Sequence, residues 1–177
     1  DIAGLTTAQI AALTTAQVQA FTTLGTGQLA AMSTSQIRAF TTAQIAAMGT
    51  DQINALSTAA TGQLAALSTS QIQALNTNQI FAMSNNTGGR ITALTSDQIR
   101  ALTTNQVRAI AAGANGIQAI EASDVAALTT SQIAAMSTAQ INALTTSPTS
   151  GQLIALSTNQ IRALTSAQIA AMTTATN

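Results

Sequence analysis

The sequence lacks cysteine, histidine, lysine, tryptophan and tyrosine altogether. Without cysteine or histidine, the chain has no disulfide framework, no catalytic triad built on those residues and none of the common transition-metal sites. Charge is scarce too: 6% of the residues are charged, and the formal net charge is zero. Nucleic-acid binding needs a basic surface that neutralises phosphates, whereas the five arginines here are scattered. We therefore expect no enzymatic activity, no cofactor and no nucleic-acid partner.

Long apolar runs are also missing. No stretch reaches the roughly 18 consecutive apolar residues that suggest a membrane-spanning helix, so the sequence predicts no membrane span. Hydrophobic residues nevertheless make up 46% of the chain, whereas disordered chains are poor in apolar residues and rich in charge. The chain can therefore bury a core, and we expect it to fold.

An eight-residue repeat fills the chain. Its positions are an apolar anchor (position 1), Ser or Thr (2), Thr (3), a variable residue (4), Gln (5), Ile or Val (6), a variable residue (7) and Ala (8). Position 8 is alanine in all 19 units, which predicts a close packing contact there. Position 5 is glutamine in 16 of the 19, the exceptions being Arg90, Gly116 and Asp124. We interpret residues 1–177 as a single repeat array and expect it to be part of a longer repeat protein.

Five units are longer than eight residues, and each of them contains a glycine. They span residues 21–31, 56–66, 83–93, 110–119 and 144–155, with Gly27, Gly62, Gly89, Gly116 and Gly151. These glycines are 27 or 35 residues apart, which is three or four octads plus three residues. The spacing predicts a higher-order coil of three to four units. Because glycine tolerates a positive φ, we expect the long units to form the sharper corners of that coil.

The octad has the signature of a helix N-terminus. Ser or Thr followed three residues later by Gln is the capping box, and flanking apolar residues such as Leu5 and Ile10 form the accompanying hydrophobic staple. The rest of the unit consists of good helix formers. We predict an all-α solenoid of very short capped helices, which are stable only when stacked on their neighbours. The alternative is a β-solenoid, because threonine and isoleucine favour strands and Ile10 alternates with Ala12.

Several side chains in this pattern allow both a functional and a structural interpretation. Capping and hydrogen bonding between coils account for the glutamines better than a ligand-binding amide row does. Regular threonines offer a face for ice or a glycan, although capping already accounts for one threonine per unit. Glu121 and Asp124 suit a carboxylate pair on one helical turn, but a favourable charge pair at a helix start is the better account.

Position 7 varies freely and is predicted to face solvent, since a buried unpaired charge is very costly. Four of the five arginines lie there: Arg38, Arg100, Arg108 and Arg162. Phe81 and Ile154 occupy the same position. Single exposed apolar residues are common, but a near-neutral surface also resists self-association poorly. Phe81 and Ile154 are therefore the candidate residues for self-association into a fibre or sheet.

The array of Leu-Thr-Thr-x-Gln-Ile-x-Ala octads resembles, from end to end, the repeat arrays of very large adhesin-like surface proteins of Gram-negative bacteria. This resemblance implies secretion and assembly at the cell surface. Haem binding does not follow from it, because histidine, cysteine and tyrosine are absent and the methionines occupy anchor positions. We expect a structural extracellular protein, a stalk, fibre or surface-coat element formed by coil stacking and self-association. The alternative is a binding module for ice or a glycan that uses the threonine face.

Overall fold

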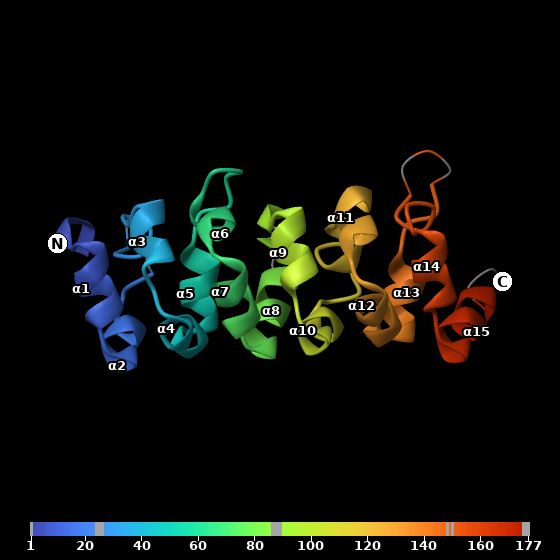
Figure 1. Cartoon of the computed structure of the whole chain (residues 1–177), viewed down its shortest axis with the longest axis horizontal. Coiled ribbons are helices and arrows are strands. Elements are labelled where there is room, and N and C mark those ends of the chain that lie inside the picture. The colour runs from blue at the N-terminus through green and yellow to red at the C-terminus, as the bar shows by residue number, and fades with distance from the viewer. Residues whose placement is uncertain (1, 24–26, 86–89, 148, 150, 175–177) are drawn as a thin grey trace.

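The computed structural model describes residues 2–23, 27–85, 90–147, 149 and 151–174. These residues form 15 short α-helices and three 3-10 helices, and they contain no strand. The prediction of an all-α solenoid is confirmed, and the alternative of a β-solenoid is wrong. The helices follow one another along one elongated body with a terminus at each end (Figure 1).

Successive units occupy the three sides of a coil, so that every third unit lies in the same row. After η1 (Ile2–Gly4), the first row holds α1 (Thr7–Ala12), α3 (Thr34–Arg38), α6 (Gln63–Ala66), η2 (Arg90–Ala93), η3 (Ile117–Ala119), α13 (Thr138–Ala143) and α15 (Ser166–Thr174). The second row holds α2 (Thr15–Gln19), α4 (Thr42–Ala47), α7 (Thr69–Ala74), α9 (Ser96–Ala101) and α11 (Ala122–Ala127). The third row holds α5 (Thr50–Ala55), α8 (Thr77–Ser84), α10 (Thr104–Ala109), α12 (Thr130–Ala135) and α14 (Thr158–Arg162).

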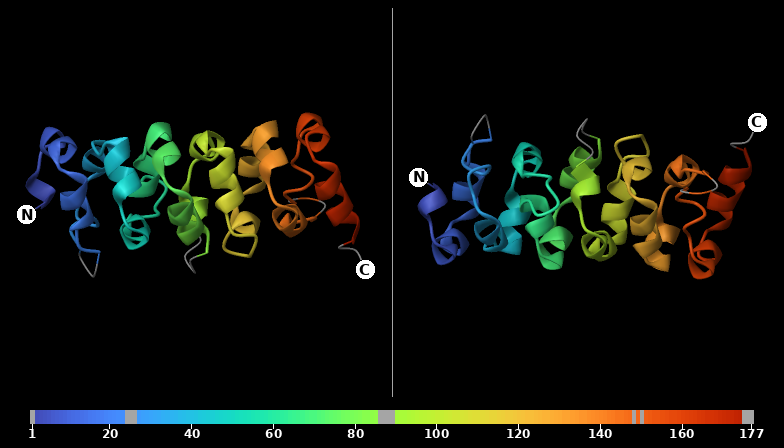
Figure 2. Two further views of the ribbon diagram at one scale, coloured as in Figure 1. Left: turned by 90° about the horizontal axis from the view of Figure 1, so that it is seen from below. Right: turned by 90° about the horizontal axis from the view of Figure 1, so that it is seen from above.

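Neighbouring helices of a row pack against each other. In the second row α2 packs on α4, α4 on α7, α7 on α9 and α9 on α11. The starts of α2, α4 and α7 are 27 residues apart, so one coil there is three units plus three residues. The rows also wind around the long axis: in Figure 1 the second row climbs from the lower edge at α2 to the upper edge at α11. The views from below and above show the same continuous body (Figure 2).

The helices begin as the octad pattern predicts. At the start of α1, the Gln9 N–H donates to Thr6 Oγ1 at 3.3 Å, and the Thr6 N–H donates to Gln9 Oε1 at 2.8 Å. The helix ends at Leu13, whose backbone is extended (φ −62°, ψ 143°), and the next cap, Thr14, is extended as well. Two extended residues in succession turn the chain from one helix into the next, so a plain octad needs no glycine at its corner.

Anchors and position-6 residues form one continuous core. Ile45 and Leu56, for example, are fully buried, and each such side chain contributes roughly 1.5–3 kcal/mol on burial. A helix of six residues is unstable alone, so packing between coils holds it in place. The alanines of position 8, such as Ala74 and Ala109, are half-buried and pack against the rim of the core. The predicted close contact at this position is therefore only partial.

In the long unit at residues 56–66, the extra residues lie between the cap residue and the glutamine. The Ser57 N–H donates to Gln63 Oε1 at 3.0 Å and the Gln63 N–H donates to Ser57 Oγ at 2.9 Å, so the capping box forms despite the insertion. A Cβ on Gly62 would lie 2.7 Å from Ser57 Oγ. The φ of Gly62 is −81°, so the expectation of a positive φ was wrong. Close approach of the folded-back loop requires glycine there. Gly89 lies outside the described residues.

Candidate functional site: the glutamine ladder between coils

The glutamine at position 5 connects two helices. Gln44 Oε1 accepts a hydrogen bond from the Thr41 N–H of its own helix at 2.7 Å. Its Nε2 donates to the carbonyl oxygens of Ile10 at 3.0 Å and Leu13 at 2.6 Å, in the preceding coil. Those carbonyls lie at the C-terminal end of α1, where no further helical turn supplies donors. One side chain thus caps the start of one helix and the end of another.

This arrangement recurs along the chain, always toward the unit four units earlier, at separations between 30 and 35 residues. We call these residues the glutamine ladder: Gln36, Gln44, Gln52, Gln63, Gln71, Gln79, Gln98, Gln106, Gln132, Gln140, Gln152, Gln160 and Gln168. All of them are buried. A primary amide offers two donors and one acceptor, and the ladder uses all three. The predicted role in capping and in hydrogen bonding between coils is confirmed.

The three units without glutamine at position 5 differ from one another. Arg90 Nη1 donates to the Leu56 carbonyl at 2.6 Å and so replaces the missing amide. Burial lowers the pKa of the Arg90 guanidinium from its ordinary value. Gly116 has no side chain to donate, and Asp124 instead accepts a hydrogen bond from Ser96 Oγ in α9. Two consecutive units therefore lack the donor that every other internal unit supplies.

Replacing Asp124 with glutamine is expected to raise the free energy of unfolding by about 1 kcal/mol, the net value of one hydrogen bond. The new amide would face the C-terminal carbonyls of Ile91 and Leu94, to which no described side chain donates. Urea unfolding followed by circular dichroism measures the change. The control is Asp97→Gln, at an exposed position outside the ladder, where no gain is expected. Destabilisation by Asp124→Gln would show that the bond from Ser96 matters more than a restored ladder.

A second set of contacts between coils was not predicted. Arg38 Nε donates to the Ala66 carbonyl at 2.9 Å, and Gln19 Nε2 donates to the Ala47 carbonyl at 2.9 Å. The arginines of α9 and α10 make the corresponding contact with the next helix of their row. Position 7 is mostly exposed, as expected, although Asn54, Ala65 and Ala134 are half-buried. Its long polar side chains reach the C-terminal end of the following helix. A positive charge is favourable there, which gives the concentration of arginine at position 7 a structural reason.

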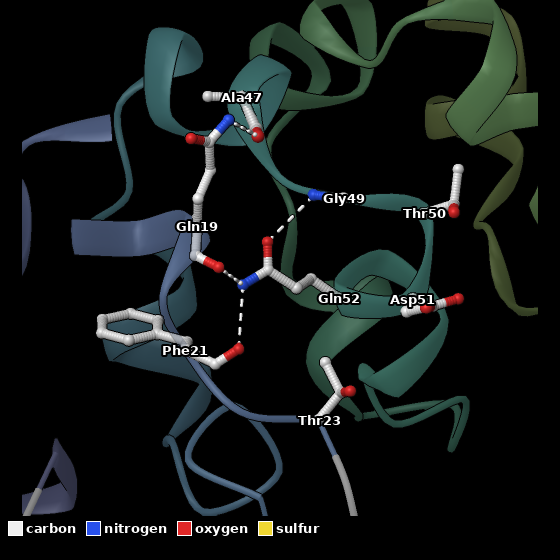
Figure 3. A pocket seen from close by; sticks show the side chains of 8 residues that line it. All are labelled: Gln19, Phe21, Thr23, Ala47, Gly49, Thr50, Asp51 and Gln52. Carbon is white, nitrogen blue, oxygen red and sulfur yellow. Dashed lines mark hydrogen bonds between the residues drawn. The ribbon is translucent and has the colours of Figure 1, made fainter. Parts of the chain in front are cut away.

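Both kinds of contact meet at a pocket of about 440 Å³ beside the start of α5 (Figure 3). Gln52 stands at its centre, with Oε1 accepting from the Gly49 N–H at 2.9 Å. Its Nε2 donates to the carbonyls of Gln19 at 3.2 Å and Phe21 at 3.0 Å. Asp51 is the single charged residue among those that line the pocket. The lining therefore offers neither a carboxylate pair nor a basic group, and its amides are engaged in structural bonds.

Phe81 and Ile154, the candidates for self-association, are 49% and 56% exposed. Phe81 belongs to α8 in the third row, whereas Ile154 belongs to a unit of the second row. The structure does not bring them together in one row, so each offers a separate contact.

Glu121 and Asp124 share the first turn of α11, but the Glu121 side chain makes no capping bond. No separate acid–base site is evident at this pair, because Asp124 is engaged with Ser96.

The two threonines of an octad have different surroundings. The position-2 hydroxyl accepts the capping bond, as Thr103 Oγ1 does from the Gln106 N–H at 3.2 Å. The position-3 residues are mostly exposed and recur once per coil along a row. In the third row they include Thr77, Thr104, Thr130 and Thr158. Helices in contact lie roughly 8–10 Å apart, so these hydroxyls are spaced about twice as widely as strands of a β-sheet, at roughly 4.7–4.9 Å.

In the part of the chain that the structure describes, no three histidine, cysteine, aspartate or glutamate residues gather where they could hold a metal ion. None of the described helices has both the length and the apolar character needed to cross a membrane.

A family model of the ALTTAQ repeat matches most of the chain, at residues 1–23, 24–58, 60–85, 117–147 and 149–176. No curated protein and no solved structure matches the chain. The family's six letters are present at residues 12–17, Ala-Leu-Thr-Thr-Ala-Gln, which run from position 8 of one octad to position 5 of the next. The capping box and the ladder glutamine are thus the features that this signature records. The chain belongs to the ALTTAQ repeat family.

Proposed function

We propose that this chain is a non-catalytic structural segment of an extracellular stalk, fibre or surface-coat element. The glutamine ladder is the observation that carries the proposal. Each ladder glutamine reaches back four units, whereas a coil contains three, so every bond spans more than one full turn of the solenoid. Adjacent coils are thereby interlocked by buried hydrogen bonds in addition to apolar packing, which suits a body that must keep its length under load.

The chemistry of the surface supports a structural role over catalysis. Charged residues are few, and the pocket beside α5 has a single carboxylate. A further pocket, whose lining includes Gln118, Asn142 and Leu153, has no charged lining residue. General acid–base catalysis needs groups that exchange protons at a reacting centre.

The extracellular location rests on the resemblance to bacterial surface arrays. Antibody labelling of intact cells that produce the protein tests it, and labelling only after lysis would contradict it.

Small-angle scattering of the purified chain, beside a tandem duplication of it, tests the structural role. A stalk element should scatter as a rod whose cross-section stays constant and whose length doubles on duplication. Each coil adds roughly the 8–10 Å of one helix layer. A duplicated chain that folds back into a compact particle would contradict the proposal.

The alternative function is a binding module for ice or a glycan. The exposed position-3 threonines, which recur once per coil along the third row, favour it. Their wide spacing and the engagement of the position-2 hydroxyls in capping favour the structural role instead. Thermal hysteresis or glycan capture by the purified chain would support the alternative, provided that Thr104→Val together with Thr130→Val abolishes the effect.

Lateral association of rods is the part of the proposal that concerns Phe81 and Ile154. Changing both to arginine is expected to leave helix content intact, because both side chains are exposed, and to abolish sheets or bundles seen by electron microscopy. The matched control is Gln73→Arg, also at position 7. If the double variant forms the same sheets as the parent chain, these two residues are not the lateral contact.

A further inference from the structure

The loop at residues 111–116 contains the one Asn-Gly step of the sequence, Asn115-Gly116. The main-chain nitrogen that follows an asparagine can attack the carbon of the side-chain amide, and glycine favours this attack because it has no Cβ and adopts many backbone conformations. Asn105 and Asn142, by contrast, lie within helices and precede larger residues. Asn115 is therefore the asparagine with the greatest chemical tendency to deamidate.

The side chain of Asn115 is not held in place by hydrogen bonds. The residue is half-buried, and its amide has no hydrogen-bond partner among the described residues. A ladder glutamine such as Gln106 uses both ends of its amide in hydrogen bonds. The Asn115 amide makes no such bonds, so none has to break before its carbon turns toward the nitrogen of Gly116.

The attacking nitrogen, in contrast, is restrained by the folded loop. The Gly116 N–H donates to the Gly113 carbonyl at 2.9 Å. Gly116 is buried, and a Cβ on it would lie 1.9 Å from the carbonyl oxygen of Ala111. To react, the nitrogen must lose its proton and move toward the Asn115 side chain, and both the hydrogen bond and the close packing oppose this. The closed loop therefore withholds the nitrogen from the reaction.

One tertiary hydrogen bond ties this loop to the preceding coil. The Ala111 N–H donates to Ser84 Oγ at 2.9 Å, and Ser84 is fully buried at the end of α8. At the other end of the loop, the Ile117 N–H donates to the Ala111 carbonyl at 2.8 Å. Ala111 thus joins the end of the loop to the coil before it, so loss of the bond to Ser84 favours an open loop.

We propose that Asn115 is a deamidation site that is closed in the folded loop and reacts when the loop opens. The Gly116 nitrogen forms a bond to Cγ of Asn115, the bond from Cγ to Nδ2 breaks, and ammonia leaves with the amide proton. Water then opens the resulting five-membered succinimide ring. Opening at Cγ leaves aspartate, and opening at the main-chain carbonyl carbon leaves isoaspartate. The reaction consumes water and needs no oxidant or reductant.

The products do not fit the loop. Isoaspartate places one additional carbon in the main chain, and either product adds a carboxylate. The packing of Gly116 against Ala111 leaves no space for a lengthened chain, so the bonds that close the loop cannot form again. The proposal goes beyond the structural role, because it assigns the array a chemical lifetime that depends on the stability of one loop.

Peptide mapping by mass spectrometry, with chromatography that separates the aspartate and isoaspartate forms, measures the reaction at position 115. The purified chain is kept at mildly alkaline pH, either folded or unfolded in guanidinium chloride. We expect the folded chain to react at least about tenfold more slowly, because only its open fraction exposes the Gly116 nitrogen. Asn115→Gln should abolish the reaction at this position in both states. Equal rates in the folded and unfolded chains, or an unfolded chain that stays unmodified at position 115, would overturn the proposal.

Two serine variants separate opening of this loop from unfolding of the whole array. Ser84→Ala removes the acceptor of the Ala111 N–H and should speed deamidation of the folded chain roughly fivefold, the effect of one hydrogen bond on an equilibrium. Ser57→Ala is the matched control, because it removes the acceptor of the Gln63 N–H in another long unit, and it should leave the rate at position 115 unchanged. Equal acceleration by both variants would overturn protection by this loop. The comparison of the folded and unfolded parent needs no variant, so it decides the proposal even if Ser84→Ala fails to fold.

Discussion

Replacing Gly116 with alanine is expected to lower the free energy of unfolding by about 3 kcal/mol or more, at or beyond the upper end of ordinary overpacking. A Cβ at this position would lie 1.9 Å from the carbonyl oxygen of Ala111. That oxygen belongs to the backbone and accepts from the Ile117 N–H at 2.8 Å, so it cannot move aside without breaking the loop. Chemical denaturation followed by circular dichroism measures the loss.

Gly113 provides the matched control, because it lies in the same loop and a Cβ there would meet nothing within 4 Å. Gly113→Ala is expected to change stability by no more than about 0.5 kcal/mol. The φ of Gly116 is −105°, outside the left-handed region, so the prediction is argued from the contact with Ala111. Equal effects of the two substitutions would show that the loop does not hold Ala111 against Gly116.

Replacing the buried Gln106 with glutamate is expected to cost about 3–5 kcal/mol at pH 7, the usual cost of an uncompensated buried charge. The new carboxylate can still accept from the Thr103 N–H, as Gln106 Oε1 does at 2.7 Å. It has no donor for the carbonyls of Ile72 and Leu75, each of which accepts from Gln106 Nε2 at 2.7 Å. Gln9→Glu, at the same position in the exposed first coil, should leave folding stability nearly unchanged.

The sign of the pH dependence follows from the surroundings of position 106. Burial and the facing carbonyl oxygens raise the pKa of the new carboxyl in the folded state above its unfolded value of about 4.3. The folded variant then binds more protons than the unfolded chain, so its stability rises as the pH falls from 7 to about 4.3. Unfolding curves of the Gln106→Glu variant and the parent at several pH values measure the difference. A penalty that is the same at pH 4 and pH 7 would mean that the carboxylate reaches solvent.

The octad predicts the helices because the hydrogen bonds that begin each helix join residues close together in the sequence. Thr6 and Gln9 are three residues apart, and the bonds between them depend only on the shape of one helical turn. The same holds for the staple pair of Leu5 and Ile10, whose apolar character is visible in every unit. A helix prediction was therefore possible without knowledge of any other part of the chain. The expectation that position 7 is exposed is correct for most units, but not for the half-buried Asn54.

The sequence predicted the capping bonds of the ladder glutamines but did not identify the distant carbonyls to which they donate. The capping bond of Gln44 with Thr41 is local, but the acceptors of its Nε2, Ile10 and Leu13, are 34 and 31 residues away. Their identity depends on how many units complete a coil, and the spacing of the long units left three and four both open. Both three and four occur in the structure. Helices of a row pack three units apart, whereas each ladder bond reaches the helix four units earlier.

By itself the sequence determined the repeat, the capped helices, the apolar core positions and the outward direction of position 7, because each of these depends on side chains within about one helical turn. Only the tertiary structure decided the partners of the ladder amides and the contacts of position-7 arginines with the next coil. It also replaced the expected reason for glycine, a positive φ, with close backbone approach at Gly62 and Gly116. The ladder bonds and the position-7 contacts join residues about 30 positions apart, and their geometry exists only once the coils have stacked.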